Sequence, residues 1–164
     1  DAAEAAAAAA ATRYPPLGER SWGPMAAYRG EPTTPPAEAN AAVSCAVMVE
    51  TARAISNLDG IAAASGVDMV FVGPFDLAIA LGTDVPGLLA DHSAHNPLDA
   101  VVAACRRAGT RAGAFAGSRD TAAALIARGF TTVAVAVDTQ LITAAGRALV
   151  DSARRIATPA EENA

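Results

Sequence analysis

The stretch Val67-Asp68-Met69-Val70-Phe71-Val72-Gly73-Pro74-Phe75-Asp76 decides the fold, because an apolar run, a Gly-Pro break and an acid follow one another directly. An earlier stretch has the same order, since the apolar run at 42–49 ends in Glu50-Thr51. An acid at the carboxyl end of a buried strand, where a helix begins, is the usual position of a catalytic or metal-binding group in parallel α/β folds. The two stretches therefore predict a parallel sheet with a functional edge.

Outward from these stretches, continuous apolar runs alternate with helical patterns. Such runs are typical of parallel strands that are covered on both faces. We expect strands at 43–49, 68–73, 111–116 and 131–137. We expect helices at 2–12, 51–63, 75–81, 97–108, 119–128 and 139–156, with loops at 13–24 and 83–96.

Four strand-helix units after a leading helix predict an α/β protein. Two closures fit this order: an open doubly wound sheet, which suits 164 residues, and half of a (βα)8 barrel, which in full needs about 250 residues. The phosphate-binding glycine fingerprints of the open folds are missing from the sequence. The chain also begins inside a helix without a preceding strand, so we expect it to be the back part of something longer.

Glu50 and Asp76 offer hard oxygen ligands of the kind that suit Mg²⁺ or Mn²⁺. The alternative for each acid is that it caps a helix or interacts with the helix dipole. For either acid alone the two interpretations are evenly matched. Their matched positions after consecutive strands favour a metal site.

Composition excludes several classes of function. The net charge is −5 and the pI is near 4.9, which does not favour nucleic acid, and no apolar run approaches the roughly 18 residues of a membrane span. Cys45 and Cys105 fall within a predicted strand and a predicted helix, without disulfide or zinc spacing. We expect both to be core residues of a cytoplasmic protein.

Several motifs together carry a family resemblance. They are Arg13-Tyr14-Pro15-Pro16-Leu17-Gly18-Glu19-Arg20, Val49-Glu50-Thr51, Asn57-Leu58-Asp59, Gly66-Val67-Asp68, Gly73-Pro74-Phe75-Asp76-Leu77 and Val137-Asp138. In order and spacing, from Asp1 to about Arg155, the chain resembles the HpcH/HpaI family of class II 2-oxo-acid aldolases. The resemblance implies a partial (βα)8 TIM barrel with strands five to eight over residues 1–157, followed by a flexible tail at 158–164.

The resemblance also implies the site. Glu50 and Asp76 correspond to the family's two protein ligands of a divalent metal, Mg²⁺ or Mn²⁺ with Co²⁺ as a further option. The backbone N–H groups of Phe75 and Asp76 correspond to those that hold the pyruvate carboxylate, and Phe115 to a residue that shapes the aldehyde pocket. Met48 departs from the family, because many relatives carry a substrate-binding glutamine there and a thioether donates no hydrogen bond.

The implied reaction is the metal-dependent cleavage or formation of the bond between a pyruvate unit and an aldehyde. The family's histidine base, its supporting aspartate and its oxyanion arginine lie in the first half of the barrel, so we expect no catalytic residue in this chain. His92 and His95 are the only histidines, and we expect both to be solvated loop residues. Asp138 either adds a third carboxylate to the site or, as we favour, caps the last helix.

Two other classes of function stay open at this point. One is a non-catalytic remnant that binds a metal and a 2-oxo acid, and the other is a barrel like citryl-CoA lyase. The second is disfavoured because the candidate loops have few basic residues for the phosphates of coenzyme A. A half barrel has strand edges that can pair with another chain, and in relatives the last helix packs on a neighbouring subunit, so we expect a homo-oligomer.

Overall fold

The computed structural model describes residues 1–23 and 25–157, so the predicted tail at 158–164 lies outside the described residues. The strands are β1 (Ala46–Val49), β2 (Met69–Val72), β3 (Arg111–Phe115) and β4 (Thr132–Ala134). The helices are α1 (Ala2–Thr12), α2 (Met25–Tyr28), α3 (Pro36–Ala42), α4 (Ala52–Ile55), α5 (Leu58–Ala62), α6 (Pro74–Ala80), α7 (Val85–Ala90), α8 (Pro97–Ala108), α9 (Arg119–Arg128) and α10 (Asp138–Ala157).

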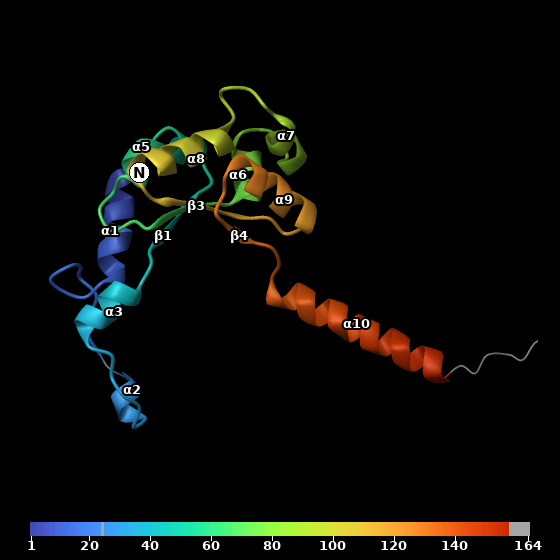
Figure 1. Ribbon diagram of the computed structural model, residues 1–164, viewed down its shortest axis with the longest axis horizontal. Coiled ribbons are helices and arrows are strands. Elements are labelled where there is room, and N and C mark those ends of the chain that lie inside the picture. The colour runs from blue at the N-terminus through green and yellow to red at the C-terminus, as the bar shows by residue number, and fades with distance from the viewer. Residues whose placement is uncertain (24, 158–164) are drawn as a thin grey trace, which may run out of the picture.

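The four strands form one parallel sheet in the order β1-β2-β3-β4, as predicted. Val49 pairs with Val72, and Val72 pairs with Ala114, so the carboxyl ends of the first three strands lie side by side. The helices that follow β1, β2 and β3 lie on one face of the sheet, whereas α10, which follows β4, extends away from it (Figure 1). The result is part of a (βα)8 barrel, which confirms the predicted fold class.

The core lies between the sheet and the helices, and it contains every second residue of the strands. Val49, Val70, Val72 and Ala114 are buried on this face, and Leu98 and Leu125 are buried beneath them from α8 and α9. Burial of apolar surface contributes about 25 cal/mol per Å², so this layer stabilises the packing of the helices on the sheet.

The opposite face of the sheet is not covered by helices in the described residues, contrary to the coverage on both faces that the apolar runs predict (Figure 1). Met48 is 57% exposed on this face, although it lies within an apolar run. In a full barrel the same face points to the barrel interior, which explains why both faces of the strands are apolar.

Two helical predictions were wrong in detail. The helix expected at 51–63 is broken between α4 and α5 at Ser56-Asn57, where both side chains bond back to carbonyls of the preceding turn. Such side-chain bonds compete with helix continuation. The loop expected at 83–96 contains α7, which begins at an Asp84 cap that accepts from Gly87 N. Short helices of this kind have too few residues for a clear apolar period.

Helix α10 extends away from the sheet (Figure 1), and its side chains from Asp138 to Ile156 are all exposed. Its apolar residues include Leu141, Ile142, Leu149 and Val150, each at least 50% exposed. A 20-residue helix with one apolar side normally buries that side against another element. The described part of this chain provides no such element.

An ion pair holds the amino end of the sheet together. Asp68, which immediately precedes β2, accepts a hydrogen bond from Cys45 N at 2.7 Å and from Arg13 Nη2 at 2.7 Å. Arg13 also donates to Gly66 O at 2.7 Å, and its side chain is only 11% exposed. Asp68 and Arg13 tie α1 to the first two strands.

Across residues 1–23 and 25–157, none of the helices combines the length and the apolar character that crossing a membrane requires.

Candidate metal and substrate site

Glu50 lies directly after β1, at the carboxyl end of the sheet, and its side chain is half-buried. The cap of the following helix is Thr51, whose hydroxyl accepts from Ala54 N at 3.1 Å. Within the described residues the Glu50 carboxylate has no hydrogen bond or ion pair with the protein. The helix-cap alternative for Glu50 is therefore wrong.

The carboxylate of Glu50 lies across the end of β2. A methyl group built on Gly73 would stand 2.6 Å from Glu50 Oε2, well inside van der Waals contact. Gly73 directly precedes Pro74, the first residue of α6. The end of the Glu50 side chain therefore lies against the start of the helix that carries Asp76.

Asp76 is the third residue of α6 and is exposed. The cap residue Gly73 offers no side-chain hydrogen bond, and the first main-chain bond runs from Leu77 N to Gly73 O at 2.9 Å. The amides of Phe75 and Asp76 consequently have no acceptor within the helix. Over the described part of the chain, the Asp76 carboxylate also makes no bond to the protein. The start of α6 therefore has two backbone N–H donors, of Phe75 and Asp76, and the Asp76 carboxylate without partners in the described protein.

Two aromatic rings border this helix start. Phe75 and Phe115 have ring centroids 6.1 Å apart with planes tilted by 50°, a favourable separation for an aromatic pair. Phe75 is 50% exposed and Phe115 is half-buried at the end of β3. The rings give the carboxyl end of the sheet an apolar wall beside the two acids.

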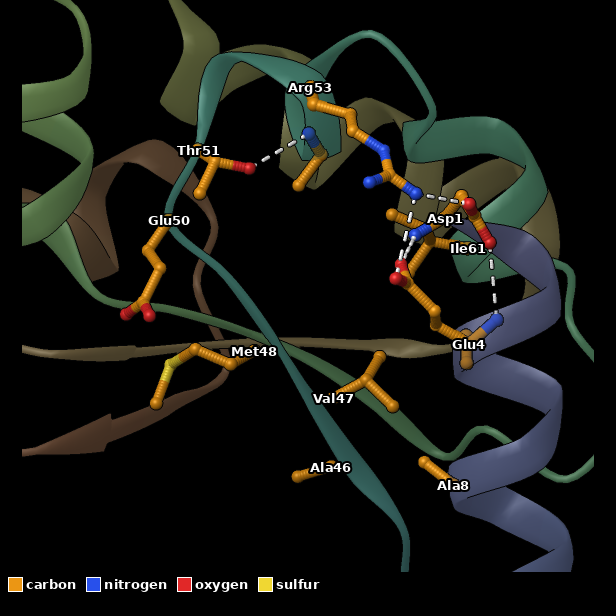
Figure 2. A pocket seen from close by; sticks show the side chains of 12 residues that line it. Asp1, Glu4, Ala8, Ala46, Val47, Met48, Glu50, Thr51, Arg53 and Ile61 are labelled. Atoms are coloured by element: carbon orange, nitrogen blue, oxygen red, sulfur yellow. Dashed lines mark hydrogen bonds and ion pairs between the residues drawn. The ribbon is translucent and has the colours of Figure 1, made fainter.

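Met48 lies two residues before Glu50, on the same face of β1. Figure 2 shows both side chains pointing away from α1. Met48 pairs in register with Phe71 of β2, and Phe71 pairs with Gly113. The floor below the Glu50 carboxylate is therefore apolar at Met48 and Phe71.

An open cleft of about 490 Å³ runs along the outer edge of β1 toward α1, and Glu50 and Met48 line one end of it (Figure 2). Its other end holds Arg53 with its ion-pair partners Asp1 and Glu4. Asp76, Phe75 and Phe115 do not line this cleft. We therefore place the candidate site over the carboxyl ends of the strands and not in the cleft.

The donor set fits a divalent metal. Two carboxylates with no protein partner in the described residues follow β1 and β2 at the carboxyl edge of the sheet. Mg²⁺ in proteins is commonly held by one or two carboxylates, with water and substrate oxygens as the remaining ligands. Residues 1–23 and 25–157 contain no cluster of three or more potential ligand side chains.

Other candidate residues lie elsewhere. His92 and His95 are exposed in the loop between α7 and α8, which lies on the helical side of the sheet (Figure 1). The Asp138 carboxylate accepts from Thr139 N at 2.7 Å, and Asp138 is itself the first residue of α10 and not the residue before it, so its capping role stays a prediction. Arg20 stacks over the Tyr14 ring at 4.7 Å. Sequence reasoning missed Gly73, for which the only signal was a glycine between a strand and a Pro.

Comparison with known proteins gives a family match. The model of the family described as "HpcH/HpaI aldolase/citrate lyase" matches residues 1–145 of this chain. The 2-keto-3-deoxy-L-rhamnonate aldolases of Salmonella dublin and Salmonella typhimurium are each 39% identical to this chain over 142 residues, which are 82% of this chain and 51% of the relative. The chain thus spans about half the length of the curated relatives it matches.

Solved structures give the same fold. An HpcH/HpaI aldolase/citrate lyase family protein from Burkholderia cenocepacia J2315 is 34% identical with a TM-score of 0.75, over 93% of this chain and 61% of that chain. An HpcH/HpaI aldolase from Desulfitobacterium hafniense DCB-2 has a TM-score of 0.70 at 24% identity, over 94% of this chain and 60% of that chain, and supports the fold alone.

Proposed function

We propose that this chain, which belongs to the HpcH/HpaI aldolase/citrate lyase family, supplies the metal-binding half of a carbon–carbon lyase. The reaction is the aldol cleavage or condensation of a 4-hydroxy-2-oxo acid, with pyruvate and an aldehyde as the products of cleavage. The small-molecule partners are thus a 2-oxo acid and an aldehyde. The aldolase names of the relatives at 39% identity support this reaction.

One observation carries the proposal: the carboxylates of Glu50 and Asp76 are both without a protein partner in the described residues, and Glu50 is turned toward the start of α6. Most other acids that flank the strands and helices are paired, as Asp99 is with Arg128 at 2.7 Å. Carboxylates that are taken out of water by the fold are normally satisfied in this way, and Glu50 is half-buried. Two unsatisfied ones at the carboxyl edge of a parallel sheet support a ligand-binding role.

A divalent metal, Mg²⁺ or Mn²⁺, would act there as a Lewis acid that polarises the 2-oxo group of the substrate. Glu50 and Asp76 would hold that ion. The amides of Phe75 and Asp76 are free to donate to the substrate carboxylate. Phe75 and Phe115 would exclude water from the bond that breaks, and Met48 would contact the substrate through its thioether without donating a hydrogen bond.

The proton of the 4-hydroxyl group needs a general base, and Glu50 and Asp76 as ligands are not free for that role. His92 and His95 lie in an exposed loop on the helical side of the sheet. We therefore propose that the base belongs to the part of the relatives' barrel that this chain does not span. The chain alone should then bind a metal and a 2-oxo acid without turnover.

The test is isothermal titration of Mn²⁺ with oxalate, a stable 2-oxo-acid analogue, into the 164-residue chain and into Glu50→Ala and Asp76→Ala. We expect metal-dependent oxalate binding that each substitution weakens at least about 100-fold, because a lost ligand exceeds the 10–100-fold cost of a lost supporting group. Asp120→Ala is the matched control, since Asp120 also lies in the first turn of a helix without a side-chain partner in the described residues.

An unchanged affinity in both variants would contradict the metal site, and an equal loss in Asp120→Ala would reveal a general charge effect. An aldol-cleavage assay on the same samples separates the catalytic proposals. Turnover by the chain alone would contradict the assignment of the base to another part of the barrel.

We also propose that copies of the chain associate. The uncovered face of the sheet and the exposed apolar residues of α10 are surfaces of the kind that oligomers bury. Cytoplasmic location and the absence of nucleic-acid partners stay predictions from composition.

A further inference from the structure

We propose that Gly73 is a positioning residue for the Glu50 carboxylate: its missing side chain leaves the space in which the end of Glu50 lies, at the start of the helix that carries Asp76. This inference rests on the proposed function, because the carboxylate is the proposed metal ligand. It assigns a role to a residue that contacts neither metal nor substrate.

The space is defined by three contacts. A Cβ atom on Gly73 would lie 2.6 Å from Glu50 Oε2, 3.5 Å from Glu50 Cβ and 3.7 Å from Glu50 Cδ. Only the first is shorter than a van der Waals contact. A methyl group at position 73 would therefore tolerate the stem of Glu50 and exclude its carboxylate oxygen.

The backbone does not require glycine at this position. Gly73 has a φ of −91°, and residues with side chains also adopt a negative φ. Gly109 and Gly129 differ, because they end α8 and α9 with φ of 73° and 106°, where a side chain is strained. Space for Glu50 is thus the reason for glycine at position 73.

The atom in the way is the far end of a flexible side chain. Glu50 can rotate to another staggered conformer at small cost, and its carboxylate has no bond to the described protein that would be lost. Gly73→Ala should therefore leave the fold intact and move the carboxylate away from the start of α6. A role in packing would instead appear as a loss of stability.

The test is the Mn²⁺ affinity of Gly73→Ala in the full chain, measured from the electron paramagnetic resonance signal of free Mn²⁺, together with thermal unfolding. We expect Mn²⁺ to bind at least about tenfold more weakly, as for other groups that orient a ligand, with an unchanged unfolding midpoint. Gly146→Ala is the control, because nothing lies within 4 Å of the added methyl group.

A double-mutant cycle adds a readout that a merely structural role would not move. Glu50→Asp shortens the side chain by one methylene, which withdraws the carboxylate from the added methyl group. In the Glu50→Asp background, Gly73→Ala should change the Mn²⁺ affinity less than twofold, so the two positions are coupled. Equal fold-losses in both backgrounds would overturn the inference.

An unchanged Mn²⁺ affinity in Gly73→Ala would also overturn it. If the unmodified chain binds no Mn²⁺, the proposed metal site fails, and crystal structures of the chain and of Gly73→Ala still decide the role of Gly73. A displaced Glu50 carboxylate in the variant supports the inference, and an unmoved one refutes it.

Discussion

The two ends of the parallel sheet hold carboxylates in opposite states. At the amino end, Asp68 accepts hydrogen bonds from Cys45 N and from the nearly buried Arg13. At the carboxyl end, Glu50 and Asp76 have no partner in the described residues, although Glu50 is half-buried. All three acids follow or precede apolar runs in the sequence. The difference separates an acid whose oxygens are used by the fold from two acids whose oxygens make no bond to the described protein.

The largest expected effect on stability comes from breaking the ion pair between Asp68 and Arg13 at the amino end of the sheet. Asp68→Ala leaves Arg13 without its carboxylate and Cys45 N without its acceptor, which should lower the free energy of unfolding by about 2 kcal/mol. Glu50→Ala and Asp76→Ala remove no protein bond and should change it by less than about 0.5 kcal/mol. Urea unfolding of the three variants measures this difference.

The exposed pair of Asp59 and Arg107 is the control for the Asp68 variant. Asp59→Ala should cost no more than about 1 kcal/mol, because solvent screens exposed pairs. Equal losses in Asp68→Ala and Asp76→Ala would remove the contrast between the two ends of the sheet.

Lowering the pH should reduce the stability that Asp68 contributes at the amino end of the sheet. The hydrogen bond from Cys45 N, followed by Arg13, holds the pKa of Asp68 below its ordinary value of 3.8, against the opposing effect of burial. A depressed pKa in the folded state gives stability that is present above the unfolded value and is lost as the pH falls through the folded value. The difference in unfolding free energy between the unmodified chain and Asp68→Asn should therefore shrink below about pH 4. A difference that stays constant from pH 6 to pH 2 would show that ionised Asp68 is not its source.

The smallest expected effect concerns Met48 at the carboxyl end. Met48→Gln places an amide donor of similar size on the face that also carries Glu50. Oxalate should bind about threefold more tightly in the presence of Mn²⁺, because one added hydrogen bond contributes about 0.5–1.5 kcal/mol. Met48→Leu, which adds no donor, is the matched control for calorimetry. Equal gains in the two variants would indicate a packing effect.

Much of this fold is predictable from the sequence, because parallel strands have continuous apolar runs that end in turn signals. All four strands lie within their predicted ranges, and α8 and α9 have the predicted bounds. The two glycines that end these helices have positive φ, as a helix stop requires. The short helix α7 was not predicted, because its six residues after the Asp84 cap are too few to show the periodic spacing of apolar residues that marks a helix.

The candidate site was only partly predictable. The positions of Glu50 and Asp76 after consecutive strands follow from the sequence, and so does their nearness once the strands are parallel. Whether each acid has a partner does not follow, because Arg13 reaches Asp68 from 55 residues away. The space that Gly73 leaves for Glu50 is likewise a property of the packed side chains. The contacts between side chains that are distant in the sequence are therefore known only from the structure.

Helix α10 has a thermodynamic consequence. Its apolar side chains are exposed along its length, and in proteins most of a helix's stability comes from the packing of its apolar face. If a second copy covers that side, part of the folding free energy depends on mass action, and the melting temperature rises with protein concentration. The stability of this chain is then a property of a solution and not of a single molecule.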